Sequence, residues 1–414
     1  LARGVGAAVI YRPADSTELA AVVVSSGDSI LLRGGATYAA SSMPASISSA
    51  ANLTIGYSGS GERAIISGGI VRDDWTFDAG NNVYSRAYGA NVLGNVTEDG
   101  VPMRFTTWTT DIATTAALMD GTSNAPYWQG AMTYDPATFT LYIRPSSGTA
   151  SQHVYVVSES NYGIYVGNTV TGLLIDGLDI RNISRHGITA FNRNGIVIQD
   201  TDFRVMGGHI PDALYMGNGI ELASGCNGAL VQRCRFYDIF DSGATTQLYE
   251  STPKTISGHT YIDNYGERYG LTVIEISTQA ANQTITDVEI DGLVAVDGQQ
   301  YSWGGDRGIG SAVSFLCNGI GSKVTRGFVK DMQCNRQRRS YIGFQHGGVC
   351  GIEDSTAAGS YFSAPVSSVG AYGPQRDLYR NFTDDYGGSA VAPSGGSWVA
   401  STANMSNAFR GMTL

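Results

Sequence analysis

Charge is scarce in this chain, and positive charge is scarcer than negative charge. Only 15% of the 414 residues are charged, and 26 Lys and Arg against 36 Asp and Glu give a formal net charge of −10 at pH 7. Proteins that bind nucleic acid neutralise phosphates with a basic surface. The one basic cluster, RQRR at 336–339, is short. The sequence therefore argues against a nucleic-acid partner.

Long apolar runs and metal-type cysteine pairs are also missing. The chain has no stretch of about 18 apolar residues, which argues against membrane insertion. The cysteines have no zinc-type spacing, and an odd number of them suits buried thiols and assembly in a reducing compartment; they are Cys226, Cys234, Cys317, Cys334 and Cys350. Neither a Walker loop, nor a G-x-S-x-G elbow, nor an H-E-x-x-H motif occurs. We therefore expect no cofactor and no metal.

Helical periodicity is nearly absent, and strand-forming and turn-forming residues take its place. The chain contains 54 Gly and 23 Tyr, a composition that favours strands and tight turns. The exception is residues 13–26, where Asp15 can cap a helix and Glu18 occupies the reciprocal capping-box position. This segment predicts one helix near the start of the chain.

The sequence repeats a short frame of alternating residues. TVTGLLIDGL at Thr169–Leu178 matches TITDVEIDGL at Thr284–Leu293, and Asn194–Phe203 and Asn227–Phe236 are weaker relatives. Short strands that recur every few tens of residues indicate stacked coils. Two sets of positions are expected to mark two sheets of the stack. The first is Ile175, Ile198, Val231, Tyr261, Ile290 and Val324, and the second begins at Gly187, Gly219, Gly243, Gly270 and Ser311.

Two segments near the start carry a family resemblance. Residues 27–38 (GDSILLRGGATY) and 55–69 (IGYSGSGERAIISGG) resemble the opening coils of the right-handed parallel β-helix superfamily, which includes pectate-lyase-like polysaccharide enzymes and bacteriophage tailspikes. The resemblance covers most of residues 13–350. It implies an all-β fold, a right-handed parallel β-helix (solenoid) with an N-terminal capping helix, because an open solenoid end exposes unpaired backbone.

The predicted organisation has four parts. Residues 1–71 form the cap and first coils, and residues 72–158, which include an alternating hairpin at Met132–Pro145, form a small antiparallel β insert. Residues 159–350 form the main β-helix, and residues 351–414 form the last coils and a C-terminal oligomerisation or tail region. Asn182, Asn194 and Asn227 lie near turns and are expected to stack between coils.

The resemblance also implies an activity. It suggests a tailspike-like depolymerase, part of a virion tail, that binds and cleaves a bacterial surface polysaccharide (capsule or O-antigen) as a homotrimer. A secreted bacterial enzyme is the alternative. Fold by itself does not establish activity, so the chemistry must come from particular residues.

Two glutamates share one local pattern, Ile220-Glu221-Leu222 and Ile274-Glu275-Ile276. If the isoleucines face the core, both glutamates face solvent. Their spacing suits two coils of about 27 residues each, with Gln247 nearly midway. Two coils would separate the carboxylates by about 9–10 Å, near the upper end of the inverting-glycosidase range, and one coil would give the retaining spacing of roughly 5 Å. Asp241 is a third candidate that could hold the water or raise a neighbour's pKa.

The register of the second glutamate is open at this point. In GLTVIEI, Leu271 and Val273 also qualify as core positions, and a slip of one residue would bury Glu275.

Aromatic and polar residues of the same coils are the candidates for substrate binding. Aromatic rings stack on the apolar faces of sugars while their polar tips form hydrogen bonds. Arg307 is expected to pair either with a substrate carboxylate or with Asp306. The predicted substrate-binding residues are Gln247, Tyr249, Tyr269, Trp303, Asp306 and Arg307, and Tyr237, Tyr265 and Tyr301 belong to the same aromatic cluster.

Two rival functions remain. A lyase that cleaves a uronate-containing glycan by β-elimination needs a base and a cation, for which the candidates are His209, His259, Lys254, Tyr261 and Arg268. No acidic triplet suggests a calcium site for such an enzyme. The other rival is a non-catalytic glycan-binding spike.

Overall fold

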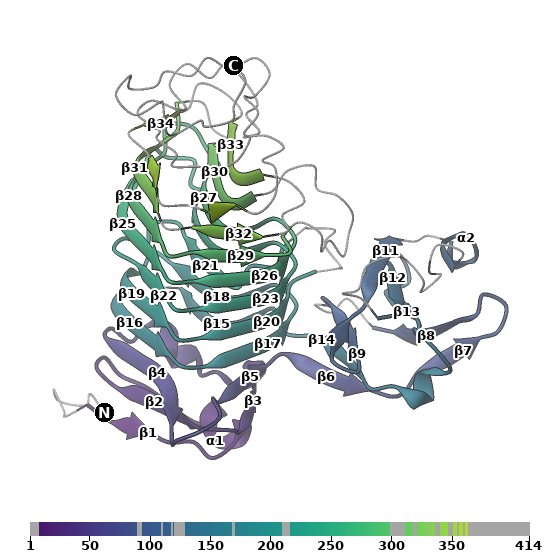
Figure 1. The fold of residues 1–414 in the computed structure, drawn as a ribbon. Helices are drawn as coiled ribbons and strands as arrows, with labels where there is room; N and C mark the ends of the chain where they lie inside the picture. Colours follow the sequence, from purple (N-terminus) through teal and green to yellow (C-terminus); the bar gives the residue numbers. More distant parts are fainter. Residues whose placement is uncertain are drawn as a thin grey trace, which may run out of the picture.

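The computed structural model describes residues 8–88, 93–108, 111–116, 119, 129–167, 170–208, 216–298, 311–317, 321–330, 332–335, 340–346, 351–353, 356–358 and 361–362. Three long sheets, in which the strand pairs of the described residues are parallel, form the stack in Figure 1. From β16 onward the chain visits the three sheets in turn, so each coil contributes one strand to each sheet. The all-β class and the stacked parallel coils agree with the prediction.

Sheets A and B run the length of the described stack. Sheet A consists of β1 (Ile10–Tyr11), β2 (Ser29–Arg33), β4 (Leu53–Ser58), β16 (Thr171–Asp176), β19 (Asn194–Gln199), β22 (Leu230–Gln232), β25 (Thr255–Ile262), β28 (Thr284–Asp291), β31 (Lys323–Lys330), β34 (Gly351–Glu353) and β35 (Thr356–Ala358). Sheet B consists of β3 (Thr37–Ala39), β5 (Ile65–Ser67), β17 (Asp179–Ile183), β20 (Asp202–Met206), β23 (Arg235–Ile239), β26 (Tyr265–Tyr269), β29 (Val294–Val296), β32 (Gln333–Asn335) and β36 (Tyr361–Phe362).

Sheet C begins later in the chain and carries the residues of functional interest. It consists of β15 (Tyr162–Gly167), β18 (His186–Phe191), β21 (Ile220–Ala223), β24 (Ser242–Leu248), β27 (Thr272–Thr278), β30 (Ser311–Cys317) and β33 (Ser340–His346). Before β15, the 3₁₀ helices η1 (Ala40–Ser42) and η2 (Ala45–Ser48) contact the edge of this sheet.

The core lies inside the stack and includes the positions predicted to mark sheet A. One ladder of sheet A, with one residue from each successive strand, consists of Ile55, Ile175, Ile198, Val231, Tyr261, Ile290 and Val329. All of them are at most 2% exposed. Val324 lies in the expected strand but pairs with Ile285. The prediction of its sheet is therefore confirmed, and the eight-residue β31 buries valines at both ends.

A column of glycines lines the start of sheet C. A Cβ atom at Gly187 would lie 2.6 Å from the Gly219 carbonyl oxygen, and one at Gly219 would lie 2.5 Å from that of Gly243. A Cβ at Gly243 would lie 2.7 Å from the Val273 carbonyl oxygen. The close approach of backbone explains these three glycines. Gly270, expected in the same set, precedes β27, and Val273 continues the column in its place.

Asparagine side chains link successive coils at the turns. The side-chain oxygen Oδ1 of Asn194 accepts hydrogen bonds from the backbone and side-chain amides of Asn227, at 3.0 and 3.1 Å. Asn227 Oδ1 accepts from the Ser257 backbone amide at 2.9 Å. Asn182 adopts a left-handed conformation with φ of 51°. These contacts confirm the predicted asparagine stacking between coils at Asn194 and Asn227.

The predicted helix at 13–26 is much shorter in the structure. Helix α1 spans only Ser16–Ala20, with Asp15 accepting from the Thr17 and Glu18 backbone amides. The three consecutive valines at 22–24 follow it in extended or irregular conformation, as suits β-branched residues. Leu19 of α1 is fully buried in the core of the first coils. Packing against the stack therefore stabilises this short helix.

The insert forms two small sheets beside the stack (Figure 1). One sheet contains β10 (Val101–Pro102), β9 (Val96–Glu98), β14 (Tyr155–Ser158) and β6 (Gly69–Arg72), and the other contains β11 (Arg104–Trp108), β12 (Ala131–Asp135), β13 (Thr140–Arg144), β8 (Val83–Ala87) and β7 (Thr76–Asp78). Helix α2 (Ile112–Ala116) and the 3₁₀ helix η3 (Ala150–Gln152) belong to the same region.

The predicted hairpin is β12–β13, closed by an Asp135 side chain that accepts from the Ala137 backbone amide. Contrary to the expectation of a wholly antiparallel insert, β11 and β12 run parallel. Val205 and Phe240 of the stack belong to the apolar core of the insert, so the insert is packed onto sheet B.

Some predictions fall outside the described residues. They include the basic cluster at 336–339 and nearly all of the segment 351–414. In the described ranges, helices are too short to cross a bilayer.

Candidate functional site

The two candidate glutamates lie on one ladder of sheet C. Thr245 of β24 pairs with Glu221 of β21 on one side and with Glu275 of β27 on the other. The ladder continues to Thr189 and Ser314. Neighbouring strands are about 4.8 Å apart, so the two glutamate Cα atoms are about 10 Å apart. The predicted alignment, two coils apart on one face, is therefore present.

The partner of Ile276 settles the register that the sequence left open: Val273 is buried in the core as well, but Ile276 pairs with Thr246, whose hydroxyl contacts Tyr261 of the core. Ile274 and Ile276 are fully buried in the core of the stack, as are Ile220 and Leu222 beside Glu221. The glutamate side chains therefore leave the opposite face of the sheet.

The glutamates do not face open solvent, as the sequence had led us to expect. Glu221 is 6% exposed and Glu275 is 4% exposed. Polar side chains from adjacent coils surround them, and buried carboxylates require such partners.

Glu221 is held by three hydrogen-bond donors. The Tyr249 hydroxyl donates to its Oε1, and the Thr189 hydroxyl donates to Oε2 at 3.4 Å. His186 Nε2 lies 3.2 Å from Oε2. Because the Asn218 backbone amide donates to His186 Nδ1 at 3.2 Å, the ring proton of the neutral imidazole is on Nε2, directed at Glu221.

Glu275 has a different set of partners. The Ser242 hydroxyl lies 2.7 Å from its Oε2, and Gln247 Nε2 donates to Oε1 at 3.2 Å. Gln247 lies on the middle coil as predicted, but it pairs with Ala223 and Ser277, on the next ladder of the same face of the sheet. Thr245 occupies the midway position, and Gln247 reaches Glu275 from the side.

All three predicted catalytic acids raise the pKa of one phenol, that of Tyr249. Burial raises the pKa of Tyr249 far above its usual range, and the negative charge of Glu221 raises it further, followed by those of Glu275 and Asp241. The Asp241 backbone carbonyl accepts from the Leu271 amide at 2.9 Å, which fixes this residue at the start of β24. The Tyr249 side chain is still 39% exposed, so the acidic cluster has an accessible aromatic edge.

The predicted aromatic cluster is divided between different parts of the fold. Tyr269 is fully buried in the core, so it cannot stack on a sugar, and we remove it from the candidate site. Tyr237 and Tyr265 form a pair on sheet B, with ring centroids 5.6 Å apart. Tyr249 alone of these four lies beside the acids. Trp303, Asp306, Arg307 and Tyr301 lie outside the described residues.

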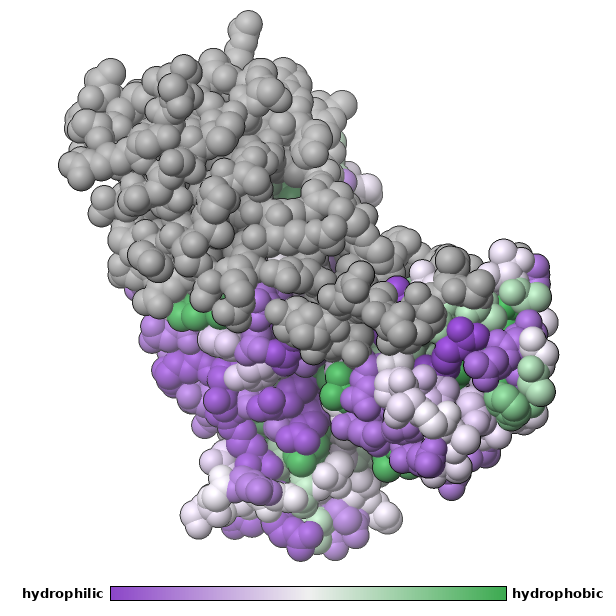
Figure 2. Space-filling model, turned by 45° about the vertical axis from the view of Figure 1, so that its right-hand side comes forward, coloured by the Kyte–Doolittle hydropathy of each residue, from purple (hydrophilic) through white to green (hydrophobic). Residues whose placement is uncertain are grey.

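The outer face of sheet B is a self-paired polar surface. Arg181 and Arg204 pair with Asp179, and Arg235 pairs with Asp202. The residues visible on the described part of the stack in Figure 2 are mostly hydrophilic. The arginine and aspartate side chains balance one another's charge, so their presence on this face does not indicate a ligand site.

The lyase candidates do not assemble into a site. His259 and Tyr261 are buried within the stack, and burial lowers the pKa of His259 to about 4. Lys254 pairs with Glu250 at 2.7 Å, and Arg268 pairs with Asp238 at 2.6 Å. His209 lies outside the described residues.

The sequence reasoning missed His186, Ser242 and Thr189. A signal was available for two of them, since His186 and Ser242 each immediately precede a glycine of the sheet C column, at Gly187 and Gly243. Residues immediately before these glycines lie at the beginning of the strands of sheet C. Their contacts with the acids nevertheless depend on side chains from different coils, which the repeat does not specify.

A second acidic group lies in the insert. Glu98, Asp99 and His153 are close enough to hold a metal ion. However, His153 Nδ1 lies 2.7 Å from Asp99 and Nε2 lies 2.8 Å from the Ser147 carbonyl oxygen. The hydrogen bond with Asp99 raises the pKa of His153. Both ring nitrogens of His153 therefore already have oxygen partners, and the absence of a metal remains a prediction.

Comparisons with known proteins assign no family to the chain. No protein-family profile and no curated protein matches it. Solved structures with similar architecture include one described as a glycoside hydrolase (TM-score 0.44, 10% identity, 92% of this chain and 91% of that one). An alginate lyase from Paenibacillus sp. str. FPU-7 has a TM-score of 0.42 at 9% identity, over 94% and 97% of the two chains. XylC in complex with xylose has a TM-score of 0.40 at 10% identity, over 84% and 75%. Similarity at this level does not assign an activity.

Proposed function

We propose that this protein binds and cleaves a polysaccharide by hydrolysis, with Glu221 and Glu275 as the paired carboxylates. The observation that supports the proposal most directly is their position on one ladder, separated by the single residue Thr245. Glycoside hydrolysis requires two carboxyl groups on either side of the scissile bond. Two strand spacings put the Cα atoms of the pair about 10 Å apart, and carboxyl groups near the upper end of the inverting range of about 6.5–9.5 Å would leave room for a water molecule.

The hydrogen bonds suggest a role for each glutamate. Glu221 accepts from three donors, an environment that suits an ionised carboxylate acting as the general base. Glu275 contacts the Ser242 hydroxyl, which can accept a hydrogen bond from a neutral carboxyl, so Glu275 is the proposed general acid. Glu221 takes a proton from a water molecule as the oxygen of that water bonds to the anomeric carbon. Glu275 gives its proton to the leaving oxygen as the glycosidic bond breaks.

Three further residues support the pair in this proposal. Tyr249 holds Glu221 and offers an exposed ring to a sugar. Gln247 orients Glu275. Asp241 contributes negative charge beside Tyr249, which favours the positive charge that develops on the sugar in an oxocarbenium-like transition state.

A lyase acting on a uronate-containing glycan is the second candidate. His186 and Tyr249 beside Glu221 are residue types that can remove a proton. Against it, the three acids would repel a substrate carboxylate. We therefore favour hydrolysis of a neutral stretch of glycan.

The test compares Glu221→Gln and Glu275→Gln with Glu250→Gln, a matched control whose carboxylate pairs with Lys254 outside the cluster. Each protein is incubated with a panel of bacterial capsules and O-antigens, and products are identified by mass spectrometry. Loss of a general acid or base is expected to reduce turnover by about 10²–10⁴-fold, and the control should remain active. Near-normal turnover in both site variants would overturn the proposal, and products that absorb in the ultraviolet would support the lyase instead.

The biological setting is a further proposal that the family resemblance supports. We propose a right-handed β-helix, because parallel crossovers are right-handed in about 98% of cases, with α1 closing its first coil. The proposed assembly is a homotrimeric phage tailspike, with a secreted bacterial enzyme as the alternative. Light scattering of the purified chain should give a trimer mass, and a monomer would count against the tailspike. Glycans that stay full-length after long incubation would favour a non-catalytic spike.

A further inference from the structure

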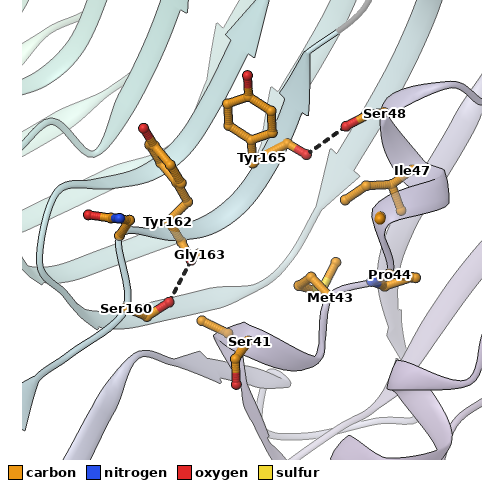
Figure 3. Close-up of a pocket in the computed structure, with 12 residues that line it drawn as sticks. Ser41, Met43, Pro44, Ile47, Ser48, Ser160, Tyr162, Gly163 and Tyr165 are labelled. Atoms are coloured by element: carbon orange, nitrogen blue, oxygen red, sulfur yellow. Dashed lines mark hydrogen bonds between the residues drawn. The ribbon is translucent and has the colours of Figure 1, made fainter. Parts of the chain in front are cut away.

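A pocket lies at the edge of sheet C, away from the glutamate cluster. It has a volume of about 410 Å³ and is bounded by the η1–η2 segment on one side and by the start of β15 on the other (Figure 3). Ligand sites in proteins occupy about 300–1,000 Å³, so the space suits a small group such as one sugar residue.

The lining has the character of a neutral sugar site. Met43, Pro44 and Ile47 form an apolar wall, and Tyr162 and Tyr165 rise from the facing strand (Figure 3). Their rings lie 5.1 Å apart, and Tyr165 is 42% exposed. None of the lining residues carries a charge. Aromatic rings and apolar surface with few hydroxyl groups match the C–H faces of an uncharged pyranose.

The η2 wall of the pocket is firmly held. The guanidinium of Arg193, which is fully buried, donates to the carbonyl oxygens of Ile47 and Ala50. The Ser48 hydroxyl donates to the Tyr165 carbonyl oxygen at 3.3 Å, which links η2 to β15 (Figure 3). Preformed walls reduce the ordering cost of binding.

A row of rings joins the pocket to the glutamates. Tyr162 stacks against His186, with centroids 6.1 Å apart and planes at 22°, and His186 contacts Glu221. Strand β15 is two strands from β21 along sheet C, which is about 10 Å. One glycan chain running along this face would meet both places.

We propose that this pocket is a binding subsite for a neutral glycosyl residue of the polysaccharide, separate from the site of bond cleavage. The proposal rests on the proposed function for its choice of ligand. It does not rest on the catalytic roles of the glutamates, so the two can be tested apart.

The experiment uses saturation-transfer NMR on the full chain. The probes are the methyl glycosides of glucose, galactose, mannose, rhamnose and N-acetylglucosamine, with methyl glucuronide as the charged comparison. At least one neutral probe is expected to bind to the unmodified protein more strongly than the glucuronide does. Tyr165→Ala should weaken that binding roughly tenfold. Phe77→Ala is the matched control, because Phe77 is an exposed aromatic residue (51%) in the insert, and it should leave binding unchanged.

A second variant guards against a folding defect. Ala45 is an exposed lining residue, and Ala45→Trp should fill the pocket and abolish binding while the melting temperature stays near that of the parent. The subsite proposal is wrong if no neutral probe binds, if the glucuronide binds better, or if both pocket variants bind like the parent.

The glutamate variants separate the two proposals. Glu221→Gln and Glu275→Gln should bind the probe normally. If they also retain full turnover while Tyr165→Ala loses binding, the hydrolase mechanism fails and the subsite stands. If they lose turnover while both Tyr165→Ala and Ala45→Trp bind like the parent, the subsite fails and the mechanism stands.

Discussion

His186 Nε2 lies 3.2 Å from the Glu221 carboxylate, from the adjacent strand of sheet C. Both side chains are buried, at 5% and 6% exposure. The Asn218 amide fixes the imidazole tautomer from the other side of the ring. This arrangement makes His186 a positioning residue for the proposed general base.

Replacing His186 should therefore alter the base and leave substrate binding nearly intact. A hydrogen bond to a charged group contributes roughly 1.5–3 kcal/mol, so His186→Leu is expected to lower kcat about tenfold or more. The KM should change little, because His186 acts on the carboxylate and not on the sugar. His186→Gln, which keeps a donor, should recover part of the activity. Equal kcat values in His186→Leu and His186→Gln would show that the residue has only a packing role.

Tyr249 is expected to have two separable roles. Tyr249→Phe keeps the ring and removes the hydroxyl that donates to Glu221, so kcat should fall about tenfold with little change in KM. Tyr249→Ala also removes the exposed ring, so KM should rise as well. Steady-state kinetics on the identified polysaccharide measures both. Equal KM values in the two variants would count against a stacking role.

His259 should make the stack sensitive to mild acid. Burial lowers its folded pKa to about 4, below the unfolded value of about 6.5. Between those two pH values the unfolded chain binds more protons, so stability is fully present above about pH 6.5 and declines as the pH falls toward 4. The loss attributable to this residue is on the order of 3 kcal/mol.

Urea unfolding at a series of pH values tests this account. His259→Leu should flatten the decline between pH 6.5 and 4. His153→Gln is the contrasting variant, because Asp99 raises the pKa of His153. Its contribution is present below about pH 6.5 and is lost as the pH rises through the folded pKa, so this variant should alter the curve on the alkaline side. An unchanged acid slope in His259→Leu would refute the assignment.

The glycine column should not tolerate a methyl group. At Gly219 a Cβ would lie 2.5 Å from the Gly243 carbonyl oxygen and 2.7 Å from the Phe236 ring, so Gly219→Ala is expected to destabilise the fold by about 1–3 kcal/mol. Gly80→Ala is the control, since the nearest atom to its Cβ is a side-chain oxygen of Asp78 at 3.3 Å. Equal unfolding midpoints in denaturant for the two variants would contradict the close packing of these coils.

The sequence alone determined the coil repeat, the all-β class and the shared ladder of Glu221 and Glu275. These follow from local regularities, because side chains alternate with a period of two and neighbouring strands keep one spacing. Matching triplets such as Ile220-Glu221-Leu222 and Ile274-Glu275-Ile276 must then present their acids on the same face. The same regularity predicted that Val324 lies in sheet A, as it does.

Only the tertiary structure decided how the acids are surrounded. Turn lengths differ from coil to coil, so the sequence did not show that Tyr249 reaches back to Glu221, that Gln247 contacts Glu275 from the next ladder, or that Tyr269 points into the core. Helix α1 ended early because Leu19 packs on the first coils and the valines after it favour extended backbone. Contacts between side chains of different coils depend on the three-dimensional path of the turns, and no period in the sequence encodes that path.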